Sequence, residues 1–473
     1  MFAAADFSAG FFGASGRALF LARRQDRAAL AVSLAAGLVW FLGRGSAMAD
    51  MVLGAAALLL GFMAPCWLPA LWVFCLPFEY AREFGGLLTV YTGEMLLLAA
   101  LPGAAWHWFR QPSWRAQILS ALGWFWPFVL VLALSAWLAQ APAAWRGLLR
   151  WWEFLLAFLL TLGWLRRSRD AERVFWAMIA AAVISAWTGV AEVAAGAGAR
   201  PELTRISLAA GDTVRAAAGF GANALAMYLA LLLPFSAAAA LFHPRPWGRL
   251  AGLLACACMT AGFLMTFSLT GWLAVACAAA VLLGWAACEQ PRWGLWTTII
   301  ALAGAALFIG LKPELLSGPF WEDKLSSWQD RWDYLFVSGR MLATSPWLGI
   351  GPGMYRHVAP LWGSGSVNPI GLLTHPHSLW LTVLVETGAA GLAAVGLAVW
   401  RYVARMAGYL RRLPAGWPQA AGWALAAGLA GFFAANFTEQ GLVHDRGMHA
   451  AVAAAAALAW LRRARSRQPE RQP

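Results

Sequence analysis

The sequence predicts an all-α, polytopic membrane protein in which residues 1–473 form a single integral-membrane domain. The first observation is the composition: 61% of the residues are hydrophobic and 12% are charged, whereas about a quarter of a soluble domain is charged. The second is the pattern, because apolar runs of roughly 17–25 residues, long enough to cross a bilayer, recur along the chain. Together they exclude a soluble enzyme and favour about 12–14 transmembrane helices.

About fourteen apolar runs qualify as membrane spans, although the third and the last are short. In chain order they lie near Ala28–Gly43, Ala47–Ala64, Trp67–Phe78, Leu88–Trp106, Ile118–Ala139, Leu148–Leu165, Val174–Ala194, Phe220–Phe242, Leu250–Phe267, Gly271–Cys288, Trp293–Leu311, Ser378–Trp400, Trp417–Phe437 and Met448–Leu461. One long polar segment, residues 312–375, interrupts them. We expect this segment to be an extramembrane loop.

The cations indicate the sidedness of the chain, whose net charge is +13. They gather in alternate gaps between spans, as the retention of Lys and Arg on the cytoplasmic side predicts. The gaps assigned to the inside hold Arg110, Arg115, Arg166, Arg167, Arg169, Arg173, Arg245, Arg249, Arg292, Arg401, Arg405, Arg411 and Arg412. Both termini are then cytoplasmic and the 312–375 loop is extracytoplasmic. Membrane topology thus accounts for the basic charge, so we expect contact with lipid and no binding of nucleic acid.

Two outside loops stand out, Ala195–Gly219 and the longer Lys312–His375. Loops of more than about 15 residues in a compact fold are usually functional. Since both open on the same side of the membrane, a site built from the two would face outward.

The long loop contains a predicted amphipathic helix, Lys324–Thr344. Its large apolar residues share one arc at helical period: Leu325, Trp328, Trp332, Leu335 and Phe336. A helix of this kind lies on the membrane surface. Lys324 and Arg331 flank the arc, where a cation either binds a substrate diphosphate or anchors to lipid phosphate. Arg340, further along, is a secondary candidate.

A histidine pair follows the loop. Pro376 suits the first turn of a helix, which would make His375 the N-cap and place His377 in the first turn. There the helix dipole favours a bound anion and keeps the imidazole neutral, able to act as a base. The alternative roles are plain capping for His375 and a hydrogen bond to the neighbouring loop for His377. Glu386 lies about 13 Å further along on the opposite face, so we expect an acid tied to another helix.

The loop and the helix also carry a sequence pattern. The chain reads P-W-L-G-I-G-P-G from Pro346 and H-S-L-W-L-T-V-L-V-E-T-G from His377. This resembles the pattern of the O-antigen ligase and polymerase superfamily, P-L-L-G-x-G-x-G followed by H-N-x-x-L-x-x-x-x-E-x-G. The positions in register are Pro346, Gly349, Gly351, Gly353, His377, Leu381, Glu386 and Gly388, and Ser378 replaces the usual Asn. Because glycines let the backbone approach a ligand closely, Gly351 and Gly353 are secondary site candidates.

Two arginines extend the resemblance. Arg331 matches the family arginine that precedes the P-L-L-G element, although the family's tryptophan four residues later is Leu335 here. Arg215 matches an arginine that precedes a helix start with the pattern G-x-F-x-x-x-N, with Asn223 one turn inside. Its alternative role is to anchor a helix end to lipid headgroups. Where the family often has S-R-G, this chain reads S-L-T-G at 268–271, so one expected arginine is missing.

The resemblance covers about residues 215–400 and implies a glycosyltransferase with a GT-C-like bundle in the bacterial inner membrane. Its donor would be an undecaprenyl-diphosphate-linked glycan at the periplasmic face, with His377 catalytic and Arg331 and Arg215 on the diphosphate. We expect neither a cofactor nor a metal, because there is no Asp/Glu cluster for a cation and arginines can bind the phosphates.

Three acceptors remain open: lipid A–core for a ligase, a second lipid-linked glycan for a polymerase, and a protein serine for a protein transferase. A different class is a non-catalytic transporter or flippase of lipid-linked glycan. Transporters often show paired halves or broken helices in corresponding positions. The sequence shows neither, and its single long loop favours an enzyme.

Overall fold

A computed structural model describes residues 14–43, 46–78, 81–84, 88–196, 205–208, 211–218, 221–289, 318–362, 375–439 and 445–465. The described chain is a helical bundle with two short antiparallel hairpins, so the predicted all-α membrane class is confirmed. One hairpin pairs β1 (Ala81–Phe84) with β2 (Leu88–Tyr91), and the other pairs β3 (Arg205–Leu208) with β4 (Gly211–Val214).

The helices of the bundle follow one another along the chain. They are α1 (Ala14–Leu42), α2 (Ala47–Met63), α3 (Leu68–Cys75), α4 (Thr92–Arg110), α5 (Pro112–Ala139), α6 (Pro142–Trp164), α7 (Ser168–Ala194), α9 (Ala222–Phe242), α10 (Pro246–Leu264), α11 (Leu269–Glu289), α13 (Gly318–Thr344), α14 (Tyr355–Trp362), α16 (Leu379–Leu410), α17 (Trp417–Ala435) and α18 (Asp445–Arg465).

Eight helices of the described chain are long and apolar enough to cross a membrane. They are α1, α5, α6, α7, α9, α10, α11 and α16, and shorter apolar helices occupy Ala47–Met63 and Pro65–Phe78. Each predicted span in the described residues coincides with helix, except that Leu88–Trp106 starts in β2 and Trp67–Phe78 combines α3 with two 3-10 turns. The predicted span Trp293–Leu311 lies outside the described residues.

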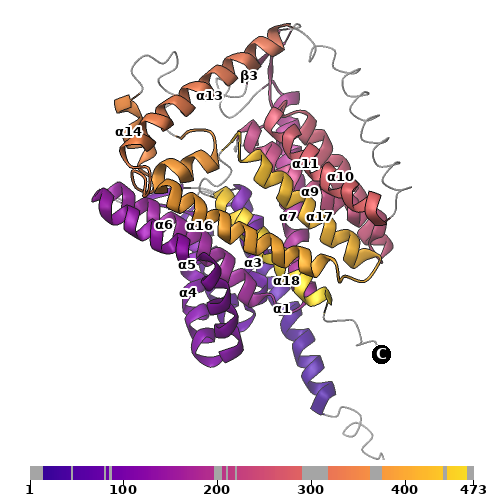
Figure 1. The fold of residues 1–473 in the computed structure, drawn as a ribbon. Helices are drawn as coiled ribbons and strands as arrows, with labels where there is room; N and C mark the ends of the chain where they lie inside the picture. Colours follow the sequence, from indigo (N-terminus) through magenta and orange to yellow (C-terminus); the bar gives the residue numbers. More distant parts are fainter. Residues whose placement is uncertain are drawn as a thin grey trace, which may run out of the picture.

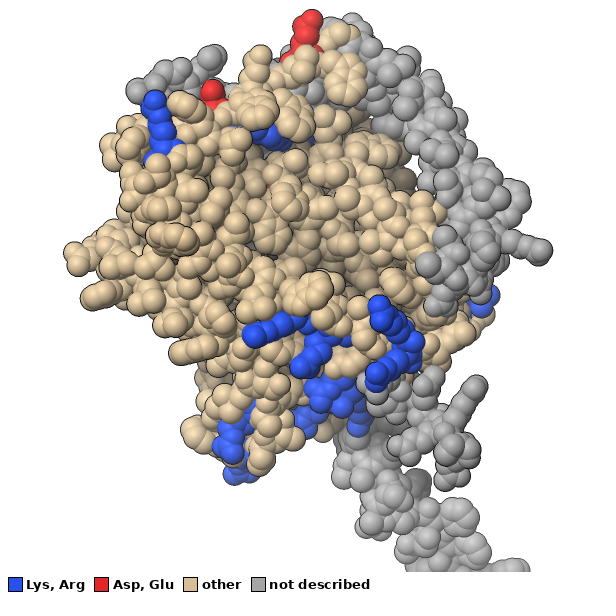
Figure 2. All heavy atoms as spheres, viewed as in Figure 1, with Lys and Arg blue, Asp and Glu red and all other residues tan. Residues whose placement is uncertain are grey.

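The two ends of the bundle differ (Figure 1). The helix α13 lies across one end, whereas α1 starts and α18 finishes at the other. Figure 2 shows Lys and Arg side chains gathered near this second end, below a broad surface with no charged side chain. A belt without charges between two polar ends is the pattern that a bilayer requires.

The predicted amphipathic helix is present as α13 and has two apolar faces. Tyr334, Val337 and Met341 are buried against α14 and α16. The arc predicted from the sequence is turned away from the bundle, and its five side chains are between 47% and 67% exposed. A second contact joins α13 to strand β3, so the two segments that the sequence predicts as long loops touch each other.

The helix α16 breaks at Gly388, whose backbone has φ 68°. The break frees backbone groups that bond to the glycine loop: Ile350 N donates to Val385 O at 3.0 Å, and Ala389 N donates to Pro346 O at 2.9 Å. Gly349 also has φ 68° and lies against the backbone of Glu386. Since neither position leaves space for a Cβ, the loop and the kink lock each other in place.

This lock gives a first prediction. Gly388→Ala should lower the melting temperature markedly and reduce any activity. The backbone of Gly388 (φ 68°, ψ −173°) lies in a region essentially restricted to glycine, where a side chain costs on the order of 1–3 kcal/mol, and its Cβ collides with the backbone of Trp347. Gly396→Ala, in the same helix with no atom near its Cβ, is the matched control and should be neutral or slightly stabilising. Equal melting temperatures for the two variants would contradict the lock.

Candidate active site

His377 lies at the end of the bundle that α13 covers, immediately before the cap of α16. The N-cap is Ser378, whose hydroxyl accepts a hydrogen bond from Leu381 N at 3.3 Å. The prediction that His375 caps this helix is therefore wrong: His377 adopts φ 47°, which keeps it and the preceding proline outside the helix. Serine caps helices about as well as the asparagine that the pattern usually has here.

The start of α16 also departs from the predicted anion site. Leu379 N donates to Asn436 O at 3.0 Å, at the end of α17, and Leu381 N is taken by the Ser378 hydroxyl. Because these amides are already paired, the helix start offers little to a phosphate. The positive charge that a bound phosphate needs must therefore come from side chains around His377.

His377 is paired with Glu439, which follows α17. The distance from His377 Nδ1 to Glu439 Oε1 is 3.1 Å, and the carboxylate is 7% exposed while the imidazole is 31% exposed. A carboxylate only accepts hydrogen bonds, so Nδ1 carries a proton, and in the neutral imidazole Nε2 keeps its lone pair. This is the arrangement of a general base oriented by an acid.

Glu439 is held on its other side by Asn223, in the first turn of α9. Asn223 Nδ2 donates to Glu439 Oε2 at 2.9 Å, and Asn223 Oδ1 accepts from Arg215 Nη2 at 3.1 Å and from the Ser268 hydroxyl at 2.8 Å. Arg215 further donates from Nε to Thr266 O at 2.8 Å. A continuous chain of hydrogen bonds therefore links Arg215 to His377.

The charge of Glu439 is stabilised by its neighbours. Burial opposes ionisation, but the imidazoles of His375 and His377 and the Asn223 amide outweigh it and hold the pKa of this carboxyl well below its usual 4.5. Glu439 is therefore an anion near neutral pH. An anion beside His377 stabilises the imidazolium that forms when the ring takes up a proton.

Arg331 reaches the same place from α13. Its Nη2 donates to Thr438 O at 3.5 Å, and its guanidinium lies 5.7 Å from the centre of the Trp328 ring. The ring of Tyr334, one turn along α13, lies 5.1 Å from the ring of His377. The structure thus brings together His377, Arg331 and Arg215, which the sequence predicted as one site.

His375 lies beside this pair, with its ring 4.3 Å from the ring of His377. Its Nε2 is 3.9 Å from Glu439 Oε1, longer than a hydrogen bond, and the two form an ion pair only when the ring is protonated. One ligand atom from each of these three residues lies within 4.8 Å of the others, so the set could hold a metal ion. The sequence did not predict this possibility, because Glu439 lies 62 residues after the histidine pair.

The other predicted candidates lie apart from His377. Gly351 N donates to Glu386 O at 3.0 Å, and Glu386 Oε1 accepts from Tyr355 N at 3.2 Å. Gly353 packs against Gly147 of α6. Gly351, Gly353 and Glu386 therefore hold the glycine loop to α16. As expected, Glu386 is tied to another helix, because Tyr355 N begins α14 and Glu386 O also accepts from the Ser135 hydroxyl of α5 at 2.9 Å.

Two cations of α13 complete the list of candidates. Arg340 is exposed and stacks over the Phe336 ring at 4.5 Å, which places it on the outer surface of the helix. Lys324 belongs to the described backbone of α13, but its side chain lies outside the described residues.

Glu439 is the residue that the sequence did not place in the site. It lies 62 residues after His377, in a short polar turn that gave no reason to prefer one side chain. The available indication was its position, because an acid at the end of an apolar helix needs a partner.

The fold and the site define a polytopic membrane protein with a histidine–carboxylate pair between two arginines. Residues 254–396 match the family model described as O-antigen ligase, which confirms the resemblance to that superfamily. The matched region contains Arg331 and His377, whereas Arg215 and Glu439 lie outside it. No curated protein matches the chain. The match supports a membrane enzyme of the class that acts on lipid-linked glycans.

Proposed function

We propose that the protein is an O-antigen ligase, which transfers a glycan from undecaprenyl diphosphate to a hydroxyl of lipid A–core. The observation that carries the proposal is the hydrogen bond between His377 and Glu439, made beside Arg331 and linked to Arg215. A base next to cations is what the transfer of a sugar from a diphosphate requires.

The bond changes follow from this geometry. Nε2 of His377 takes the proton of the acceptor hydroxyl as its oxygen bonds to the anomeric carbon of the glycan. The bond between that carbon and the diphosphate oxygen breaks, and undecaprenyl diphosphate leaves with the electron pair. Glu439 stabilises the imidazolium, while Arg331 and Arg215 offset the charge that develops on the leaving group.

The acceptor decides between ligase and polymerase. In vesicles that contain the purified protein and the undecaprenyl-diphosphate glycan, the proposal predicts a product only when lipid A–core is added. A ladder of glycans from the donor alone would instead show a polymerase. Transfer to a serine peptide would show a protein transferase, and either result would replace the ligase assignment.

We further propose that the site faces the periplasm and that both termini are cytoplasmic, in the bacterial inner membrane. The support is the gathering of Lys and Arg at the end of the bundle opposite α13 (Figure 2). In a variant without native cysteines, Thr344→Cys at the end of α13 should react with an impermeant thiol reagent in intact spheroplasts. Arg412→Cys, beyond α16, should react only after lysis. The opposite labelling would invert the topology.

The proposed mechanism needs no metal. Both oxygens of Glu439 are engaged, one by His377 and one by Asn223, so a cation would have to displace the bond that orients the base. Transfer should therefore survive EDTA at full rate. If EDTA abolishes transfer and one divalent cation restores it, the group of His375, His377 and Glu439 is a metal centre and the general-base mechanism is wrong.

A further inference from the structure

The side chain of Asn223 lies between a cation and an anion. Its Oδ1 accepts a hydrogen bond from Arg215 Nη2 at 3.1 Å, and its Nδ2 donates to Glu439 Oε2 at 2.9 Å. In the described chain the hydrogen-bonded connection between this guanidinium and this carboxylate therefore runs through one neutral amide. An amide suits the place, because it offers an acceptor to the cation and a donor to the anion.

The hydroxyl of Ser268 fixes the orientation of this amide. Ser268 is 1% exposed, and its Oγ donates to Asn223 Oδ1 at 2.8 Å while it accepts from Gly271 N at 3.1 Å. An arginine only donates hydrogen bonds. A flipped amide would therefore set its NH₂ group against the guanidinium of Arg215 and its oxygen against the carboxylate of Glu439. The NH₂ group of Asn223 is thus directed at Glu439.

Arg215 and Glu439 would attract each other strongly without this amide. The side chain of Glu439 is 7% exposed, and opposite charges attract more strongly in such surroundings than in water. A direct ion pair between the two would change both halves of the site. It would neutralise the guanidinium that is proposed to bind the donor diphosphate, and it would draw the carboxylate away from His377.

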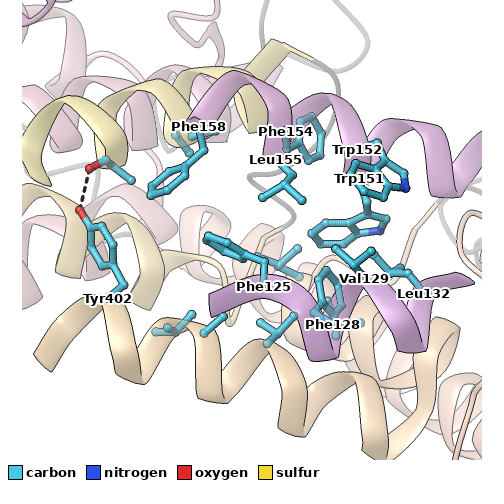
Figure 3. A pocket seen from close by; sticks show the side chains of 18 of the residues that line it. Phe125, Phe128, Val129, Leu132, Trp151, Trp152, Phe154, Leu155, Phe158 and Tyr402 are labelled. Carbon is cyan, nitrogen blue, oxygen red and sulfur yellow. Dashed lines mark hydrogen bonds between the residues drawn. The ribbon is translucent and has the colours of Figure 1, made fainter. Parts of the chain in front are cut away.

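The other flank of the site provides no charge to oppose such a pair. Leu379 and Trp380, at the start of α16, line an apolar pocket between α5, α6, α16 and α18, and none of its lining residues is charged. Figure 3 shows Phe125 and Phe128 of α5 facing the aromatic side chains of α6 across this pocket. The separation of the two charges therefore depends on the contacts of Asn223.

We propose that Asn223 is a positioning residue that keeps Arg215 and Glu439 from forming an ion pair. Arg215 then keeps its charge for the donor diphosphate, and Glu439 keeps its charge for His377. The proposal rests on the proposed function, since it concerns how the same site is kept ready for its donor. Asn223 touches no reacting atom in this account.

The first test measures the binding of labelled undecaprenyl diphosphate to the protein in vesicles. Asn223→Ala should weaken binding by about tenfold or more, the loss expected for one charge-assisted hydrogen bond to a phosphate. Asn223→Ala/Glu439→Gln should recover most of the affinity, because glutamine carries no charge to pair with Arg215. Its turnover should stay low, because the anion beside His377 is missing. A purely structural role of Asn223 predicts instead that the double variant binds no better than the single one.

Two further variants serve as controls. Asn223→Ala/Glu192→Gln removes a carboxylate that caps the backbone N–H groups of Ala217 and Ala218, and it should bind the donor as weakly as Asn223→Ala. Recovery in this variant would show a general effect of charge and would overturn the proposal. Asn223→Asp has nearly the size of asparagine and remains available if the alanine variant does not fold. It should also weaken donor binding, because it gives Arg215 an adjacent anion.

The second test needs no substrate. Phenylglyoxal modifies guanidinium groups, and the half-buried Arg215 is followed by mass spectrometry of its peptide. Arg215 should react several times more slowly in Asn223→Ala than in Asn223→Ala/Glu439→Gln, because only the first variant keeps a carboxylate for the ion pair. The two variants leave the same space at position 223, so equal rates would overturn the proposal.

The two tests separate this proposal from the proposed function. If the phenylglyoxal rates differ as expected but wild type transfers no glycan, the proposed function fails and the role of Asn223 stands. If wild type transfers glycan but Glu439→Gln does not restore donor binding to Asn223→Ala, the role of Asn223 is wrong and the proposed function stands.

Discussion

Replacement of His377 should abolish glycan transfer while the donor still binds. Loss of a general base lowers turnover by roughly 10²–10⁴. His377→Asn is the better variant, because asparagine tolerates the positive φ of this position and cannot take up a proton. Turnover is measured with saturating donor, and donor binding is measured separately with labelled undecaprenyl diphosphate.

Variants of Arg331 should differ from those of His377 in their effect on donor binding. Arg331→Ala should weaken donor binding as well as turnover, and Arg331→Lys should restore only part of both, because an ammonium lacks the planar fork that binds a phosphate. His357→Ala, on the exposed face of α14, should leave both quantities unchanged. If correctly inserted His377→Asn protein keeps near-normal transfer, the histidine has only a structural role in the turn before α16 and the catalytic assignment is wrong.

Glu439→Gln should lower turnover by roughly 10²–10⁴, although Glu439 touches no reacting atom. The amide cannot stabilise an imidazolium, and it can turn its NH₂ group toward Nδ1 and select the wrong tautomer of His377. Glu439→Asp keeps the charge and should restore part of the activity. Glu192→Gln is the matched control, since Glu192 caps the backbone N–H groups of Ala217 and Ala218 and is not bonded to the histidine.

The same carboxylate makes a prediction about stability and pH. The pKa of Glu439 is lowered in the folded protein, so its ionised form stabilises the fold at pH values above the usual 4.5. The stability advantage of wild type over Glu439→Gln should therefore be constant from about pH 7 to about pH 5. It should shrink only as the pH falls below 4.5 toward the lowered pKa. A difference in melting temperature that already shrinks near neutral pH would contradict the buried anion.

The membrane helices could be predicted from the sequence because a bilayer demands long apolar runs of fixed length. The amphipathic α13 could be predicted for a similar reason, since helical period alone places Trp328 and Trp332 on one face. The start of α16 could not, because the left-handed backbone of His377 is set by its contacts with Glu439 and Tyr334. Pro376 suits the first turn of a helix, and it therefore suggested that α16 is capped by His375 instead of Ser378.

The candidate site was predictable only in part. His377, Arg331 and Arg215 lie in recognisable motifs, but Glu439 and Asn223 enter the site through packing of α9 against α17. For the glycines, the sequence suggested a role that the structure does not show. Their pattern suggested a ligand-binding loop, whereas Gly349 and Gly388 let two backbone segments pack against each other. A sequence motif indicates a constrained segment without saying whether a substrate or the chain itself imposes the constraint.

The most direct test of the central claim is the stoichiometry of glycan transfer by the purified wild-type protein in vesicles. With the undecaprenyl-diphosphate glycan and lipid A–core as substrates, the acceptor should gain the mass of the glycan. One undecaprenyl diphosphate should be released for each glycosidic bond formed. Movement of the donor between leaflets with no new glycosidic bond would show a transporter and would contradict the account.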